Sequence, residues 1–411
     1  MSDALSAAFA DEWGRVVATL VRVTGDWALA EDAAQDAFAA ATVTWPRDGV
    51  PTRPGAWLTT VARNRALDRL RRAGREARLL DGLATDAGEE ERDVEPDDVP
   101  DDRLRLIFTC CHPALPMEAR VALTLRTLCG LTVAEIAAAF GVAEPAMAKR
   151  LVRARTRIRV AGIPYRVPSG ALLEERLPGV LAVLYLLFTE GYAPSAGPAA
   201  ARPDLAREAI RLARVLARLL PDDEVLGLLA LELLQDSRRA ARTDADGGIV
   251  PLEEQDRTRW DAAAIEEALA VLALAERGGA DAGPYRLQAR IAAEHARGPS
   301  ADGEVVIGAY DALLALTGSP WIELARAVAM GNARGPDAGL AALHPLRVAG
   351  ALAEDPGPAA AEAELQRRAG RLAQAAAAYR EALALVRNDA ERRHLQRRLQ
   401  EVDPPGPTGA H

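Results

Sequence analysis

The stretch LTVAEIAAAFGVAEPAMAKRLVRARTRI, residues 131–158, constrains the fold more than any other part of the chain. Thr132 and Glu135 form the S/T-x-x-E capping box that begins a helix. Gly141 falls where the end of a helix favours a left-handed residue, and Pro145 suits the first position of the following helix. This pattern predicts two helices joined by a tight turn, which is a helix-turn-helix.

The second of these helices has an apolar face and a strongly basic face. Its inner residues recur at helical spacing and are Met147, Leu151, Ala154 and Ile158. Its outer residues are Lys149, Arg150, Arg153, Arg155, Arg157 and Arg159. Cations at this density neutralise phosphates and release counterions, and only the beginning of the helix, about 146–153, can reach base edges in a major groove. The pattern predicts a DNA-binding helix, although a solvated basic helix face would look similar.

The distribution of charge supports this prediction, although the net charge of −9 alone argues against binding to nucleic acid. Residues 103–166 contain eleven basic and three acidic side chains, so this segment is a basic module. Residues 81–102 contain one basic and eleven acidic side chains. We expect this acidic segment to be a flexible tether; the alternative is a strip that mimics DNA and lies on a basic surface of the same chain.

The N-terminal part also predicts helices. Residues 9–43 fit two helices with a break at 25–26, the Pro- and Gly-rich stretch 44–55 predicts a loop, and 56–78 fits a third helix. On the third helix, apolar residues such as Leu58 and Val61 face inward. Its outward residues are Arg63, Asn64, Asp68, Arg71 and Arg72, a set suited to contacts with bases and phosphates but also compatible with an ordinary amphipathic helix.

The C-terminal half consists of Ala- and Leu-rich stretches separated by Gly and Pro, with a short helix expected at 336–343. Gly335 and Gly370 are 35 residues apart, and each precedes a helix of small residues. This period is similar to that of tetratricopeptide repeats, although an Ala-rich helical hairpin would give the same match by composition. Because only 4% of the residues are aromatic, close-packed helices are favoured over sheets throughout.

We therefore expect an all-α protein. Two small helical domains, 1–78 and 103–166, are joined by a linker at 79–102 and followed by a larger helical, tetratricopeptide-like domain at 167–403 and a disordered tail at 404–411. No apolar run of 18 residues and no signal-peptide pattern occurs. These features and the three cysteines predict a cytoplasmic protein without a membrane partner.

Two stretches contain residue types that also occur in metal or redox sites. Cys110, Cys111 and His112, with Cys129 further on, lack the C-x₂₋₄-C spacing of zinc ligands. Asp244 begins a D-x-D-G stretch that lacks the remaining ligands of a calcium loop. We expect no metal and no cofactor. The sequence also lacks a phosphate-binding Gly loop and a nucleophile elbow, and we expect the protein not to be an enzyme.

Taken together, these segments resemble the sigma-70 family of bacterial transcription initiation factors, of the extracytoplasmic-function type. LAEDAAQDAFAAA (29–41) is similar to the family's core-binding helix, AWLTTVARNRALDRLRR (56–72) to the helix that engages the −10 promoter element, and the helix-turn-helix to the domain that reads the −35 element. The resemblance covers residues 9–75 and about 103–162. It implies core RNA polymerase and promoter DNA as partners.

The resemblance also implies roles for individual residues. The residues implied to face polymerase are Asp32, Gln35, Asp36 and Phe38. Those implied to contact the −10 element are Trp57, Arg63, Asn64, Asp68, Arg71 and Arg72, with the loop 44–55 capturing a flipped base. Those implied to contact the −35 element are Ala146, Ala148, Lys149, Arg150, Arg153, Arg155 and Arg157. The recognition helix begins with Pro145-Ala146-Met147 where the family has Gly-Thr-Val. The −35 sequence preference of other family members therefore cannot be transferred to this chain.

The region after 167 resembles a subgroup of these factors that carries a long helical extension, through LYLLFTEGY (184–192) and RTDADGGIVPLEEQDRTRW (242–260). Two roles for the extension stay open. In the first role, the extension acts in cis as a built-in regulator. In the second role, it adds contacts needed for a productive polymerase complex. Either role uses a protein partner or an intramolecular contact. The alternative function for the whole chain is a stand-alone helix-turn-helix regulator with a helical sensor domain.

Overall fold

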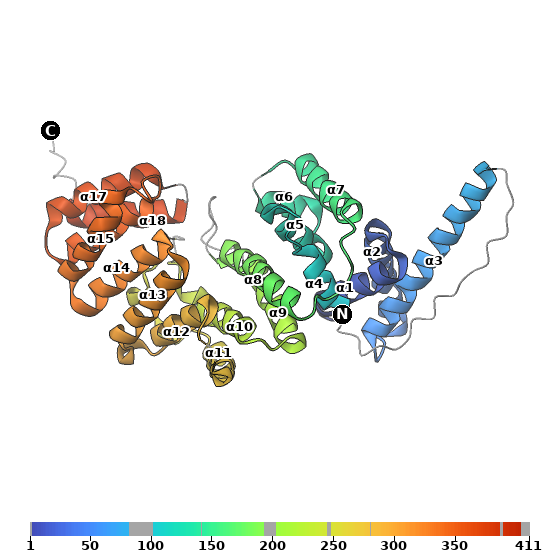
Figure 1. Cartoon of the computed structure of the whole chain (residues 1–411), viewed down its shortest axis with the longest axis horizontal. Coiled ribbons are helices and arrows are strands. Elements are labelled where there is room, and N and C mark those ends of the chain that lie inside the picture. Colours follow the sequence, from blue (N-terminus) through green and yellow to red (C-terminus); the bar gives the residue numbers. More distant parts are fainter. Residues whose placement is uncertain are drawn as a thin grey trace. The chain divides into compact units, whose positions relative to one another are not determined.

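The computed structural model describes residues 2–81, 102–140, 142–192, 203–244, 248–279, 281–386 and 389–403. In these ranges the chain is helical apart from one isolated antiparallel bridge between Thr243 and Ile249. It divides into two compact units, Met1–Val183 and Leu184–His411 (Figure 1). The all-α prediction is confirmed.

In its described residues, the first unit contains seven complete α-helices and the beginning of an eighth. Helix α8 crosses the boundary, so that 171–183 belong to the first unit. The helices are α1 (Ser2–Thr24), α2 (Trp27–Asp48), α3 (Pro54–Asp81), α4 (Asp102–Cys110), α5 (Met117–Thr127), α6 (Val133–Ala139), α7 (Glu144–Val160) and α8 (Ala171–Tyr192).

Helices α1, α2 and α3 pack against one another and form the α1–α3 module. The break predicted at 25–26 is confirmed: Gly25 has φ +68°, and the Asp26 carboxylate accepts the N–H groups of Ala28 and Leu29 at the start of α2. Trp13 and Leu58 are buried in the core of this module. The apolar spacing in the sequence therefore identifies the buried faces.

The loop predicted at 44–55 is shorter than expected. Helix α2 continues through Pro46 to Asp48, and Gly49 then donates its N–H to the Trp45 carbonyl at 3.0 Å. Helix α3 begins at Pro54, which leaves only 49–53 outside the two helices. The prediction was wrong for 44–48 because the Trp45 side chain is buried, and its packing holds the last turn of α2 despite the proline.

Helices α4 to α7 form a second group, the α4–α7 module, which contains the helix-turn-helix (Figure 1). Its core includes Phe108, Leu123 and Leu125. The first half of α8 belongs to the same unit, and Arg176 on it donates a hydrogen bond to the Phe108 carbonyl at 2.9 Å. Residues beyond the helix-turn-helix thus contribute to the first unit.

The second unit is a succession of helices in which each contacts its neighbours along the chain, as in helical repeat proteins. Its α-helices after α8 are α9 (Pro203–Leu219), α10 (Asp223–Asp236), α11 (Ala262–Ala275), α12 (Pro284–Ala296), α13 (Gly303–Thr317), α14 (Pro320–Arg334), α15 (Pro336–Ala349), α16 (Pro356–Arg368), α17 (Leu372–Leu385) and α18 (Asp389–Val402). Short 3-10 helices lie at η1 (Arg239–Ala241), η2 (Leu252–Glu254), η3 (Arg257–Arg259), η4 (Glu276–Gly278) and η5 (Gly298–Ser300).

The repeat detected in the sequence corresponds to two helical hairpins, α14–α15 and α16–α17 (Figure 1). Gly335 and Gly370 lie in the turns of these hairpins with φ +98° and +76°, a conformation that other residues rarely adopt. Helix α15 is longer than the predicted 336–343 and runs past Pro345 to Ala349, because Leu346 is buried beyond the proline and anchors the final turn.

Three sequence-based predictions lie outside the described residues. They concern the acidic segment, of which 82–101 are not described, the turn residue Gly141, and the tail 404–411.

Candidate nucleic-acid interface

The helix-turn-helix is built as its sequence predicts. The Thr132 hydroxyl accepts the Glu135 N–H at 3.2 Å, and the Glu135 carboxylate accepts the Thr132 N–H at 2.7 Å, so the capping box is complete. Ile136 and Ala137 are the buried residues of α6. The buried residues of α7 are Met147, Leu151, Ala154 and Ile158, as the spacing predicts. These contacts fix which side of α7 is available to a ligand.

The outer face of α7 divides into exposed residues and residues with partners inside the unit. Ala146, Lys149 and Arg153 are exposed, whereas Ala148 and Arg150 are half-buried. The Arg150 guanidinium lies over the Phe140 ring, 5.6 Å from its centroid. The exposed part at the beginning of α7 therefore coincides with the segment expected to reach base edges.

The second half of α7 is engaged within the unit. Arg155 is half-buried, and its Nη2 lies 2.5 Å from Oε1 of Glu31 on α2. Arg157 is exposed and donates from Nε to the Ala114 carbonyl at 2.9 Å. In this conformation Arg155 points to the α1–α3 module, and its guanidinium is held by a carboxylate.

A second polar face lies on α3. Arg63, Asn64, Arg71 and Arg72 are exposed, and so is Asp68, whose carboxylate is 3.7 Å from Arg71. Trp57 differs from these residues because it is half-buried and packs edge to face against Trp45, with ring centroids 5.7 Å apart. The structure thus brings five of the six predicted residues to the surface of one helix.

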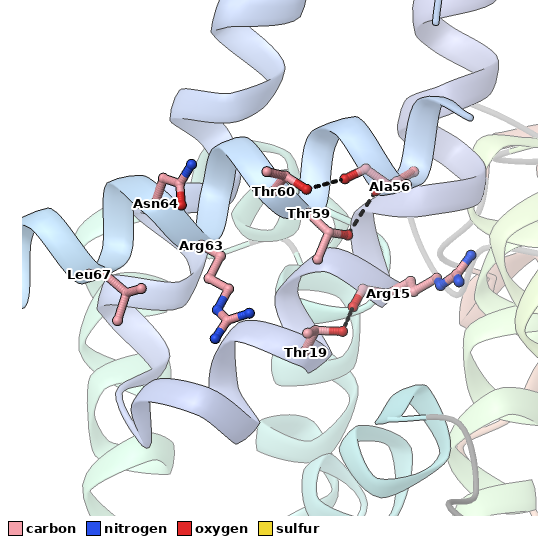
Figure 2. Close-up of a pocket in the computed structure, with 9 residues that line it drawn as sticks. Arg15, Thr19, Ala56, Thr59, Thr60, Arg63, Asn64 and Leu67 are labelled. Carbon is pink, nitrogen blue, oxygen red and sulfur yellow. Dashed lines mark hydrogen bonds between the residues drawn. The ribbon is translucent and has the colours of Figure 1, made fainter. Parts of the chain in front are cut away.

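The beginning of this face borders a pocket of about 590 Å³ between α1 and α3 (Figure 2). Figure 2 shows the Arg63 side chain extending from α3 into the space between the two helices. The lining residues are Arg15, Thr19, Gly55, Ala56, Thr59, Thr60, Arg63, Asn64 and Leu67. The volume is in the range of small-ligand pockets, and two guanidinium groups beside threonine hydroxyls can bind a phosphate and the polar edge of a base.

Sequence reasoning missed much of this pocket. It assigned base capture to the loop 44–55, of which only Gly55 lines the pocket. The α1 residues Arg15 and Thr19 were not predicted at all. The sequence does contain a signal for the α3 side of the pocket, which is the helical spacing of its lining residues. These residues form two adjacent stripes with a spacing of four, at 56, 60 and 64 and at 59, 63 and 67. Pairing with α1, however, cannot be read from that spacing.

The four residues expected to face polymerase are on α2 but have different environments. Asp32 and Gln35 are exposed, and Asp36 is half-buried. Phe38 is only 6% exposed and packs against the rings of Phe9 and Trp13, with centroids 5.1 and 5.8 Å away. In this conformation Phe38 supports α2 from inside, and the surface available to another protein is acidic and polar.

Two arginines that the sequence analysis did not single out neutralise this acidic surface. Arg69 on α3 lies 2.6 Å from the Asp36 carboxylate and 3.4 Å from that of Asp32. Arg65 lies 3.7 Å from Asp36. Arg65 and Arg69 are four residues apart and lie on one side of α3. The acidic surface of α2 is therefore continuous with a basic stripe on α3.

The cysteine-rich stretch and the Asp244 stretch have ordinary structural surroundings. Cys110, Cys111 and Cys129 are buried free thiols. Burial raises the pKa of Cys110 well above its usual value and that of Cys111 to about 12. The Asp244 carboxylate accepts the Gly248 N–H at 2.7 Å and lies 2.6 Å from Arg397. Among the described residues, no group of three or more His, Cys, Asp or Glu side chains is placed to hold a metal ion.

In the second unit, the two stretches that resemble the extension of a sigma-factor subgroup lie together. Tyr192 at the end of α8 is covered by Arg242, whose guanidinium carbon is 3.6 Å from the ring centroid. Arg257 lies 4.4 Å above the ring of Trp260, and Arg238 lies 6.0 and 5.8 Å from the Tyr192 and Trp260 rings. Cation–π contacts therefore join the two stretches.

None of the helices in the described part of the chain combines the length and the apolar character needed to cross a lipid bilayer.

The comparisons with known proteins agree with these features. Residues 10–76 match the family model of sigma-70 region 2, and 105–158 match that of sigma-70 region 4. Residues 176–276 match a family of unknown function, DUF6596. The two sigma-70 matches cover the modules that carry the basic faces of α3 and α7.

Two relatives extend the comparison. The chain is 41% identical to an uncharacterized protein of Rhizobium meliloti (strain 1021), over 94% of this chain and 92% of the relative. It is 33% identical to the ECF RNA polymerase sigma factor SigL of Mycobacterium tuberculosis (strain ATCC 25618 / H37Rv), over 38% of this chain and 88% of SigL. No solved structure matches the chain significantly. The chain belongs to the sigma-70 family as a sigma factor of the extracytoplasmic-function type, in the subgroup that carries a long helical C-terminal extension.

Proposed function

We propose that this sigma factor binds core RNA polymerase through α2, directs it to promoters through α3 and α7, and opens the −10 region. The single observation that carries the proposal is that three exposed polar faces lie on the helices that correspond to these steps: Asp32 and Gln35 on α2, Arg63 and Asn64 on α3, and Lys149 and Arg153 on α7.

The face of α2 supplies the polymerase contact. Asp32 and Asp36 share Arg69 at 3.4 and 2.6 Å, on a surface that is exposed or half-buried. Exposed ion pairs of this kind contribute little to folding, so the carboxylates can exchange Arg69 for a basic group of a partner at small cost. Opposite charge on the partner also accelerates association.

The pocket between α1 and α3 supplies the −10 contact. Arg15 and Arg63 provide positive charge for a phosphate, and Asn64 and the threonine hydroxyls can bond to the edge of an unstacked base. Unstacking costs a few kcal/mol, which contacts inside a pocket can offset, so strand opening does not require ATP. Asp68, Arg71 and Arg72 continue the strand path along α3, and Trp57 supports the start of this helix.

The recognition helix α7 supplies the −35 contact. Its first exposed residues, Ala146, Lys149 and Arg153, lie where a helix-turn-helix reaches base edges, together with the half-buried Ala148 and Arg150. Arg157 and, once its bond to Glu31 is broken, Arg155 add contacts to phosphates at the far end of the helix.

Co-elution and transcription test the proposal. The full chain is mixed with core RNA polymerase, passed through a gel-filtration column, and assayed for RNA synthesis on genomic DNA fragments. We expect one complex and RNA that starts at discrete sites. Operator binding without co-elution would instead support a stand-alone helix-turn-helix regulator, and the proposal would then be wrong.

The helical extension takes part in this activity as a regulator in cis or as a source of contacts needed for a productive complex. A chain ending at Tyr192 tests its role and retains the Arg176 hydrogen bond to Phe108, which a chain ending near Pro168 would lose. Higher transcription than that of the full chain indicates inhibition in cis. Lost transcription with retained polymerase binding indicates a required role, and unchanged transcription contradicts both.

A further inference from the structure

Three arginines of the second unit gather around two aromatic rings. The Arg242 guanidinium carbon lies 3.6 Å from the Tyr192 ring centroid, and that of Arg257 lies 4.4 Å from the Trp260 centroid. The Arg238 guanidinium is near both rings, 6.0 Å from the first centroid and 5.8 Å from the second. We call these five residues the arginine cluster.

The hydrogen bonds of the three guanidinium groups go to neutral acceptors. Arg238 Nη2 donates to the Tyr192 hydroxyl at 2.7 Å, and Arg242 Nη1 donates to the carbonyl of the same tyrosine. Arg257 Nη1 donates to the His295 carbonyl at 3.0 Å. None of the three arginines forms an ion pair with a carboxylate among the residues that the structure describes. A guanidinium group carries five N–H donors in a fork that fits a carboxylate or a phosphate, so these bonds use only a small part of the donors.

The acidic side chains nearest the cluster do not neutralise it. The Asp236 carboxylate forms an ion pair with Arg239, and Glu294 forms one with Arg297 at 2.8 Å. Glu232 is fully buried, and burial raises its pKa well above the usual value, which favours the uncharged acid. The cluster therefore carries an excess of positive charge.

Neighbouring groups respond to this excess charge. Burial lowers the pKa of His295 to about 4, and Arg238 and Arg257 act in the same direction. Because Arg242 and Arg238 lie 3.6 and 6.0 Å from the same Tyr192 ring centroid, their guanidinium carbons are within about 10 Å of each other, which is close to the Debye length at about 0.1 M salt. Like charges at this separation repel, and an anion bound between them relieves the repulsion.

The cluster also contains a buried donor without an acceptor. The Trp260 side chain is only 8% exposed, and its indole N–H has no hydrogen-bond partner within the described ranges. Buried indole N–H groups usually have a partner, because an unmade hydrogen bond costs free energy. The indole and the three cations thus lack the same kind of group, an anion with acceptor oxygens. Such a ligand has access from solvent, because Arg257 is exposed and Arg238 and Arg242 are half-buried.

We propose that the arginine cluster is a binding site for a small anion that carries a phosphate or carboxylate group. The guanidinium groups bind the oxygens of the anion, and the Trp260 N–H donates a further hydrogen bond to it. The ligand is small because the indole N–H is buried among side chains that are themselves half-buried. The site belongs to the second unit, so this inference goes beyond the proposed function and does not depend on it.

Hydrogen exchange of the full chain tests the site directly. Inorganic phosphate or succinate is added at constant ionic strength, with chloride as the reference anion. We expect at least one of the two to slow exchange by at least about fivefold in peptides covering 185–192, 236–244 and 248–260, because a ligand that binds the folded form suppresses local opening. The anion that acts at the lower concentration shows whether phosphate or carboxylate is preferred. Peptides from α3 and α7 report separately on phosphate bound to the promoter-binding faces.

Two substitutions distinguish a ligand site from a purely structural cluster. Trp260→Phe keeps an aromatic ring and removes the unpartnered donor. We expect about tenfold weaker anion binding, the effect of losing one hydrogen bond to a charged group, and no loss of stability without the anion. Arg257→Gln removes the exposed cation and should also weaken binding at least about tenfold. Arg214→Ala is the matched control: its guanidinium is already paired with Glu267 at 2.7 Å, and its loss should leave the affinity unchanged.

Unchanged exchange in the three segments with both anions would overturn the inference. So would slower exchange that keeps the native affinity in both Trp260→Phe and Arg257→Gln, because the anion would then bind elsewhere. If Trp260→Phe does not fold, Arg257→Gln alone decides the outcome. Co-elution with polymerase is expected in every case, so its failure contradicts the proposed function and not the anion site.

Discussion

Trp45 on α2 and Trp57 on α3 meet edge to face, with ring centroids 5.7 Å apart, at the two ends of the connection between these helices. Trp45 is 3% exposed, and Trp57 is half-buried. The pair holds the short segment 49–53 and fixes where α3 starts. Because the pocket between α1 and α3 begins at Gly55, this contact determines the position of the pocket relative to α2.

Trp45→Ala should destabilise the α1–α3 module by about 3–5 kcal/mol, because it removes a buried aromatic ring. Trp45→Phe should cost less, since it keeps a ring and removes an indole N–H that has no hydrogen-bond partner among the described residues. Hydrogen exchange of peptides from α2 and α3 measures both effects. Trp321→Ala is the control: this side chain is 52% exposed, and its loss should leave exchange in α2 unchanged. Equal exchange in the Trp45→Ala and native chains would contradict the role given to the pair.

Asp36→Ala should weaken binding to core polymerase by about tenfold, the effect of losing about 1.4 kcal/mol at a contact. Stability should change by less than about 1 kcal/mol, because the two side chains of the ion pair, 42% exposed at Arg69 and 35% at Asp36, are partly in contact with water. Titration with labelled polymerase and thermal unfolding separate the two effects. Glu304→Ala, which breaks an exposed ion pair with Arg334 in the second unit, should not alter polymerase affinity. If Asp36→Ala binds polymerase with unchanged affinity, the proposed contact between α2 and polymerase is wrong.

Lys149→Ala should weaken −35 binding and reduce the slope of log K against log salt concentration by about 1, because one fewer phosphate is neutralised. The affinity of holoenzyme for a promoter fragment, measured at several salt concentrations, gives this slope. Arg290→Ala removes a half-buried arginine paired with Glu276 in the second unit and serves as the control. A slope equal to that of the native protein would show that Lys149 does not contact phosphate.

Glu232→Gln should stabilise the second unit increasingly as the pH rises above about 4.5. Glu232 is fully buried, and both carboxyl oxygens lack hydrogen-bond partners within the described part of the chain, so burial and the nearby Asp236 raise its pKa well above the usual value. Above the unfolded pKa, the unfolded chain releases this proton before the folded chain does, and native stability falls with rising pH. Glutamine abolishes that dependence. Urea midpoints at pH 5 and pH 8 test this, and a difference between variant and native chain that does not grow with pH contradicts it.

Acid should destabilise the second unit through His295. Burial, with Arg238 and Arg257 nearby, lowers the pKa of His295 to about 4. The unfolded imidazole has a pKa near 6.5, so the unfolded chain binds the proton first as the pH falls. Native stability therefore has its full value above pH 6.5 and decreases as the pH falls to 4. His295→Gln should flatten the stability curve between these values, whereas His344→Gln is the control. An identical loss of stability between pH 6.5 and pH 4 in the His295→Gln and native chains would contradict this explanation.

Most helical elements and their buried faces could be predicted from the residues. Spacing and caps identified the helix-turn-helix, with Met147, Leu151, Ala154 and Ile158 inside and Lys149 outside. The break at Gly25 and the repeat at Gly335 and Gly370 also followed from the residues, because capping and left-handed glycines act over a few neighbours. The all-α class and the family follow from such local signals.

The neighbour that each face meets depends on tertiary packing. It assigned Phe38 to the core with Phe9 and Trp13, extended α2 past Pro46, and paired α3 with α1 to form a pocket. It also joined Glu31 to Arg126 and Arg155, which are 95 and 124 residues away in sequence. Helical periodicity shows that a side chain is turned inward or outward. The partner it meets depends on how distant segments pack, and that information is not contained in the local pattern.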